Sequence, residues 1–129
     1  MWRATLRSRA GLWGPVLAYM VLIFVLSAQA EPPLPPQVSD KQGHSLGYMG
    51  LAMTIGRALA GGVASGATLP VAAGAWAMAA AFGASDEWHQ TFVAGRSSEL
   101  GDWYADAAGA LAGAGACWAW GIIRARADV

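Results

Sequence analysis

Four long stretches with almost no charged side chains constrain this chain more than any other feature. Gly11–Ala30 contains 20 residues and no charge, and Ala58–Ser85 contains 28 uncharged residues. His44–Gly61 is interrupted only by Arg57, and Ala107–Ile123 is uncharged throughout. A helix needs about 20 apolar residues to cross the hydrocarbon core of a bilayer. The sequence therefore predicts membrane-spanning helices.

The longest uncharged stretch is too long for a single span and divides at a glycine-rich turn. Residues 61–66 read GGVASG, and Leu69-Pro70 follows as a helix start, because proline is tolerated in the first turn. We predict an all-α fold, a single domain over 1–129, built as a transmembrane bundle of four helices at about 11–30, 44–61, 69–88 and 103–123. A proline-rich outer loop at 31–39, with an extended polyproline conformation, joins the first two.

The first uncharged stretch also fits a secretory signal peptide. Arg3, Arg7 and Arg9 precede it, and it ends in small residues at Ala28-Gln29-Ala30. However, the stretch exceeds the roughly 7–15 residues of a signal core, and three further hydrophobic spans follow it. We interpret it as a retained helix; a mature N-terminus at Glu31 would contradict this interpretation.

Composition limits the classes of partner. The chain is 56% hydrophobic and 12% charged, which is low for a soluble domain, and its net charge of zero offers no basic surface for nucleic acid. We therefore expect membrane lipid, and no nucleic acid, as a partner. The lone Cys117 cannot form an internal disulfide and is expected to pack as a small side chain.

The distribution of basic residues predicts the orientation. If the helices alternate in direction, Lys41 and Arg96 lie on one side of the membrane and six arginines on the other. The positive-inside rule then places both termini in the cytoplasm of a multi-pass protein of the inner (plasma) membrane. The six arginines are Arg3, Arg7, Arg9, Arg57, Arg124 and Arg126.

A stripe of small residues marks one face of the last span. Gly109, Gly113, Cys117 and Gly121 recur every four residues. Such stripes let helices approach closely in lipid. We expect this stripe to pack within the monomer, with a homodimer through the same face as the alternative.

Polar side chains collect at three predicted helix ends on the outer side. Helical spacing places Asp40, His44 and Tyr48 on one face. The interpretation without function is that Asp40 or Ser39 caps the second helix, Asp102 caps the fourth, and the remaining charges are solvated by headgroups. Ionisable groups at membrane depth are costly, however, so the set predicts an outward-facing polar site. The other members are Asp86, His89 and Gln90, which share a face, Glu87, and the pair Asp102 and Asp106.

The residue types allow two chemistries. Acid–base catalysis would use His89 or His44 tuned by Asp86 and Glu87, with Arg96 or Lys41 holding an anionic group. Metal binding would draw on Asp40, His44, Asp86, His89 and Asp102, but the sequence has no HExxH or comparable zinc spacing. It also lacks a GxSxG elbow and a P-loop. We predict no metal and no cofactor, and the reaction, if any, stays open.

Three ordered motifs resemble the VanZ-like membrane proteins, from about Trp13 to Gly113. The pattern D-K-x-x-H-x-x-x-Y-x-x-L is similar to residues 40–51, S-D-E-x-x-Q-x-F-x-x-x-R to 85–96, and D-x-x-A-[ND]-x-x-G-x-x-x-G to 102–113. The first helix also ends in Ser27-Ala28-Gln29, similar to the family's serine-rich exit. Ala94 departs from the proline frequent there in the family, and the family pattern does not fix His89.

The resemblance implies a small integral membrane protein of the cell envelope whose namesake lowers susceptibility to teicoplanin. On this basis we expect a pocket for an amphiphilic ligand, such as a lipid-linked cell-wall precursor or a lipoglycopeptide. The alternatives are an enzyme that modifies an envelope lipid and a non-catalytic partner-binding subunit. The expected pocket residues are Asp40, Lys41, His44, Tyr48, Asp86, Glu87, Gln90, Arg96, Asp102 and Asp106.

Overall fold

Four helices make up most of the chain in this computed structural model, which describes residues 7–29, 34–64, 66–96 and 99–127. The described residues contain no strand, so the predicted all-α class is confirmed. The helices are α2 (Arg9–Ser27), α3 (Asp40–Ala60), α4 (Leu69–Gln90) and α5 (Leu100–Ala127).

Polar caps explain why α3 begins four residues before its apolar stretch. The Ser39 side chain accepts a hydrogen bond from the backbone N–H of Gln42, and the Gln42 side chain accepts one from the N–H of Ser39. This reciprocal capping box satisfies two of the free donors of the first turn. The helix ends at Gly61, whose φ of 81° is the left-handed conformation that glycine adopts without strain. Ser39 is therefore the N-cap of α3, as the capping interpretation of the sequence expected.

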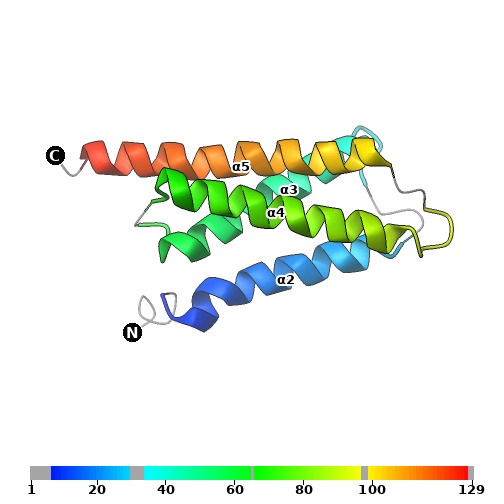
Figure 1. The fold of residues 1–129 in the computed structure, drawn as a ribbon, viewed down its shortest axis with the longest axis horizontal. Helices are drawn as coiled ribbons and strands as arrows, with labels where there is room; N and C mark the ends of the chain where they lie inside the picture. The colour runs from blue at the N-terminus through cyan, green and yellow to red at the C-terminus, as the bar shows by residue number, and fades with distance from the viewer. Residues whose placement is uncertain (1–6, 30–33, 65, 97–98, 128–129) are drawn as a thin grey trace.

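The helices alternate in direction along the chain (Figure 1). The start of α2 and the end of α5 lie at one end of the molecule, together with the α3–α4 turn. The start of α3, the end of α4 and the start of α5 lie together at the opposite end. This up-down arrangement is what brings the polar segments of the three sequence motifs to one end.

Helices α3 and α5 pack most extensively against each other. Their backbones approach so closely that a Cβ atom at Gly109 would overlap the Ser45 carbonyl, and one at Gly113 would overlap the Met49 carbonyl. The small-residue stripe therefore faces α3 within the same chain, as expected. A homodimer through the same face stays a prediction.

Helix α2 lies outside this pair and contacts α3 and α4. It buries Val16 and Ile23 but leaves large apolar side chains such as Leu17 and Val21 more than half exposed. Among the described residues, α2 alone has both the length and the hydropathy of a membrane span. The other helices contain glycines and charged side chains, which lower their mean hydropathy. The four-span arrangement and the cytoplasmic termini thus stay predictions.

The loop after α2 differs from the expected extended spacer. Residues 30–33, which include two of its prolines, lie outside the described residues. Beyond them, the Val38 N–H donates to the Pro35 carbonyl at 3.0 Å and closes a turn. The polyproline prediction is therefore wrong for residues 35–38, where this turn leads directly into the Ser39 cap.

Candidate functional site

The polar end of the molecule is built from α3, α4 and α5, and His44 on α3 is at its centre. The His44 Nδ1 atom lies 2.7 Å from Asp106 Oδ1 on α5 and 3.9 Å from Glu87 Oε1 on α4. On the other side of the ring, Nε2 lies 3.6 Å from Asp40 Oδ2, one turn earlier on α3. One imidazole thus connects carboxylates from all three helices.

A second pair lies beside this cluster and links α3 to α4. The buried Tyr48 hydroxyl donates to Asp86 Oδ2 at 3.2 Å. Gln90, one turn after Asp86, is completely buried, and neither its amide nitrogen nor its amide oxygen has a hydrogen-bond partner among the described residues. An amide buried in this state costs roughly 1–3 kcal/mol. Such an unsatisfied group is typical of a site that binds something polar.

Lys41 connects the cluster to its exposed rim. Its Nζ atom lies 3.2 Å from Glu99 Oε2 and 3.4 Å from Asp102 Oδ1. Hydrogen bonds to Glu99 and Asp102 and their negative charges raise the pKa of the Lys41 ammonium. Lys41 therefore stays charged and holds the start of α5 against the start of α3.

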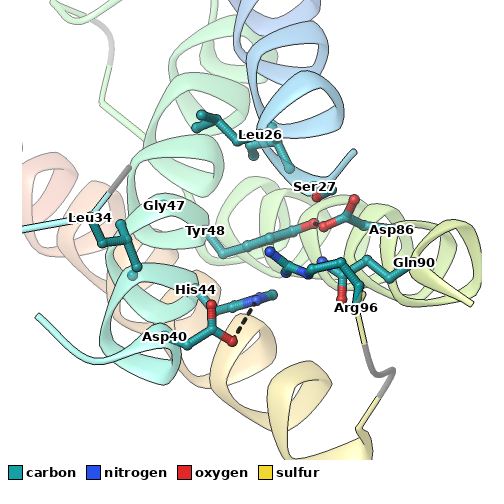
Figure 2. Close-up of a pocket in the computed structure, with 12 residues that line it drawn as sticks. Leu26, Ser27, Leu34, Asp40, His44, Gly47, Tyr48, Asp86, Gln90 and Arg96 are labelled. Atoms are coloured by element: carbon teal, nitrogen blue, oxygen red, sulfur yellow. Dashed lines mark hydrogen bonds and ion pairs between the residues drawn. The ribbon is translucent and has the colours of Figure 1, made fainter. Parts of the chain in front are cut away.

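A cavity of about 100 Å³ opens between α2, α3 and α4 beside His44 (Figure 2). One wall is polar and presents His44, Asp86 and Arg96, while the other presents apolar side chains of α2 and the following loop. In Figure 2, Arg96 and Gln90 lie close to the Tyr48–Asp86 pair. The cavity is lined by Ile23, Leu26, Ser27, Leu34, Asp40, Gly43, His44, Gly47, Tyr48, Asp86, Gln90 and Arg96.

The structure divides the predicted pocket residues into two groups. Six of them line the cavity: Asp40, His44, Tyr48, Asp86, Gln90 and Arg96. The other four do not line it. Asp106 and Glu87 lie against His44, and Asp102 contacts Lys41. Glu87 points away from Asp86 because consecutive residues of a helix are about 100° apart, as 3.6 residues per turn require.

Two residues do not have the positions that helical spacing suggested. His89 lies outside the cluster, and its ring stacks on Phe24 of α2 with 4.1 Å between centroids. His89 is thus removed as a candidate base or metal ligand beside Asp86. Asp102 is not the N-cap of α5, which begins at Leu100; it lies within the first turn and is 4% exposed.

Several contributors to the site were not predicted. Ser27 is buried at the end of α2 and lines the cavity, as do Ile23, Leu26 and Leu34. The Gln29 carbonyl accepts a hydrogen bond from Arg96 Nη1 at 3.3 Å. Apolar residues and backbone carbonyls carry no distinctive signal in a sequence. Ser27 and Gln29 belong to the Ser27-Ala28-Gln29 segment that resembles the family's serine-rich end of the first helix. That resemblance was the available sequence signal for them.

The described residues also offer candidate ligands for a metal. One nitrogen of His44 and one oxygen each of Glu87 and Asp106 lie within 4.8 Å of one another. A second set, Asp40, His44 and Asp102, meets the same distance but includes the exposed Asp40. Neither set equals the five residues that the sequence suggested for metal binding.

These features define a class: a small all-α protein with one strongly apolar outer helix and a polar site buried at one end of three others. The sequence profile of the VanZ/LLP1 family matches residues 12–123, nearly the whole chain. The protein therefore belongs to the VanZ/LLP1 family. No curated protein and no solved structure matches it.

Proposed function

We propose that this VanZ-family protein acts in the cell envelope by binding the polar head of an amphiphilic ligand in the cavity beside His44. The observation that carries the proposal is the pairing of unlike walls. Arg96, Gln90 and Asp86 form the polar wall, and Ile23 and Leu26 the apolar one. Sites for small molecules typically combine apolar walls with a few polar groups that fix orientation.

The size of the cavity limits which part of a ligand enters. Pockets for drug-sized molecules are roughly 300–1,000 Å³, whereas this cavity is about 100 Å³. A head group of a few atoms fits, and a complete lipoglycopeptide does not. The apolar part of such a ligand would extend along the exposed side chains of α2 into lipid.

The exposed apolar side chains support insertion of all four helices in a membrane. Large apolar side chains are exposed on each helix, among them Leu22, Met53, Met78 and Leu111. In water, a bundle of amphipathic helices would bury one face and expose a polar one. Exposed aromatic side chains also lie near both ends, which is where membrane proteins place Trp and Tyr. They include Trp88, Phe92 and Tyr104 at the polar end and Trp118 and Trp120 at the other.

The ligand class follows from the charges of the polar wall. Arg96 suits a phosphate or carboxylate, and Asp40 and Asp86 suit an amine or sugar hydroxyls. Lipid-linked cell-wall precursors combine such groups with a long apolar tail. A protein that binds these precursors in the outer leaflet would alter access of teicoplanin, which acts on the same material. Lower susceptibility to teicoplanin would then be a consequence of binding.

The test is expression in a teicoplanin-sensitive Gram-positive host that lacks family members. The parent is expected to raise the inhibitory concentration at least fourfold, and Arg96→Ala and Asp86→Asn to abolish the increase. His89→Ala is the matched control, because His89 lies outside the cavity, and it should protect like the parent. All variants must be present at equal levels. Full protection by both cavity variants, or none by the parent, would contradict this role.

One observation favours an envelope-lipid enzyme as a second candidate. Asp106 lies against Nδ1 of His44, and Nε2 lies on the side of Asp40, which lines the cavity. Histidines that transfer protons are often oriented by a carboxylate in the same way. Mass analysis of lipids from expressing and non-expressing cells tests this. A species that changes with the parent but not with His44→Ala would support catalysis; unchanged lipids would exclude it.

A further inference from the structure

We propose that His44, Glu87 and Asp106 bind a divalent transition-metal ion of the zinc or manganese class. The proposal is independent of the amphiphilic ligand, since only His44 of these three lines the cavity. It also departs from the sequence-based expectation of no metal. That expectation relied on short ligand motifs, whereas these ligands come from three different helices.

The geometry is close to that of a metal site. His44 Nδ1 lies 2.7 Å from Asp106 Oδ1 and 3.9 Å from Glu87 Oε1, and all three donor atoms lie within 4.8 Å of one another. Around one ion with bonds of about 2.0–2.2 Å, tetrahedral ligand atoms are about 3.3 Å apart. Side-chain rotations that change these separations by a few tenths of an ångström to about 1.5 Å would place all three ligands on one ion.

The carboxylates of this cluster are buried. Asp86, Glu87, Asp102 and Asp106 are each less than a tenth exposed. His44 is the basic group that faces Asp106 and Glu87, at 2.7 Å and 3.9 Å, while Lys41 lies against Asp102. A divalent cation bound through a neutral imidazole would bring a larger positive charge to the same two carboxylates than a protonated His44 does, and burial strengthens that attraction.

An unpartnered oxygen points independently to a missing ligand. Asp106 is completely buried, and its Oδ2 atom has no hydrogen-bond partner among the described residues. This oxygen faces Gly83, where a Cβ atom would lie only 3.1 Å from it. The absence of a side chain at Gly83 thus leaves Asp106 room to turn and bind through either oxygen.

The surroundings of His44 complete the arrangement. Metal-bound histidines usually donate their second ring N–H to a carboxylate, which orients the ring. Asp40 Oδ2 lies 3.6 Å from His44 Nε2, just beyond hydrogen-bond distance, so a small rotation of the Asp40 side chain would bring it into this position. One imidazole with two carboxylates suits Zn²⁺ or Mn²⁺ better than Ca²⁺, which prefers oxygen ligands alone.

The test uses the full chain, purified in detergent, stripped with chelator and titrated with ZnCl₂ and MnCl₂. Bound metal is measured by mass spectrometry after desalting. We expect one ion per chain, and at least tenfold weaker binding by Asp106→Asn and Glu87→Gln, which keep side-chain size. His89→Ala and Glu99→Gln are matched controls outside the triad and should bind like the parent. Parental affinity in both triad variants would overturn the proposal.

The parent alone provides a second measurement that does not depend on variants folding. Co²⁺ bound to nitrogen and oxygen ligands gives visible absorption bands, and Zn²⁺ should displace them at a stoichiometry of one. The melting temperature should also rise with the concentration of the ion, because a ligand that binds only the folded state stabilises it. Absence of saturable binding and of a melting shift would overturn the proposal, whatever the outcome of the teicoplanin or lipid experiments.

Discussion

His44 and Asp106 are separated by 62 positions in the chain, yet His44 Nδ1 and Asp106 Oδ1 lie 2.7 Å apart. The contact joins α3 to α5, the two helices with the most extensive packing. It occurs where Gly109, one turn after residue 106, lets the helices approach each other most closely. The close packing of the α3 and α5 backbones therefore also holds His44 and Asp106 in contact.

Replacing His44 by alanine should destabilise the protein strongly. The substitution leaves the Asp106 carboxylate buried without its partner, and losing one member of a buried pair costs about 3 kcal/mol or more. Denaturant unfolding in detergent measures the free-energy change. His89→Ala should cost about 1 kcal/mol, since it removes only an aromatic stack on Phe24. Equal stability of the two variants would contradict the central position of His44.

Gly109→Ala should destabilise the α3–α5 interface. The new Cβ atom would overlap the Ser45 carbonyl, which is backbone and cannot move without shifting α3. Overpacking of this kind costs about 1–3 kcal/mol. Gly115→Ala on the same helix is the control, because nothing lies within 4 Å of its added Cβ atom. There the higher helix propensity of alanine should leave stability unchanged or raise it by about 1 kcal/mol. Thermal unfolding of both variants measures these two changes in stability, and equal changes would contradict the close approach of α3 and α5 at Gly109.

The all-α class with four helices was predictable, because long apolar stretches divided by glycine- and proline-containing turns favour helices of this length. The joint location of Asp40, Asp86 and Asp102 at one end also followed, since alternating helices bring these segments together. The cavity did not follow. It depends on Ile23, Leu26 and Leu34, whose apolar side chains look like any others in such a sequence.

The face that each polar residue presents was predicted less well. Helical spacing grouped His89 with Asp86 and Gln90 and set Glu87 apart. The structure instead places Glu87 beside His44 and His89 against Phe24. Spacing gives relative angles on one helix, but which angle faces which neighbour depends on how α4 rotates against α2, α3 and α5. That rotation is decided by packing of many small residues.

The predicted topology can be tested by labelling. In a Cys117→Ala background, Lys41→Cys and Arg96→Cys should react with a membrane-impermeant maleimide added to intact cells. Val63→Cys lies between α3 and α4, in the turn at the opposite end of the molecule (Figure 1), and should react only after permeabilisation. The expectation follows from the excess of arginine at that end. The reverse labelling pattern would place the cavity on the cytoplasmic side and exclude a role in the outer leaflet.

Gln90→Leu should stabilise the ligand-free protein while weakening ligand binding. Gln90 is completely buried, and both polar atoms of its amide lack partners, so an apolar side chain of similar size removes an unmet hydrogen-bonding need of about 1 kcal/mol or more. Gln42→Leu, at the same end, is the opposite case. The Gln42 side chain accepts the Ser39 N–H at 2.9 Å, so its loss should cost about 1 kcal/mol of capping. Unfolding experiments on the two variants should therefore give changes of opposite sign.

Protection against teicoplanin should fall with Gln90→Leu despite its higher stability, because stability and function conflict where a polar group is kept for a ligand. A destabilised Gln90→Leu protein would show instead that the amide is satisfied in the folded state, and the argument for a vacant polar site beside Asp86 would fail.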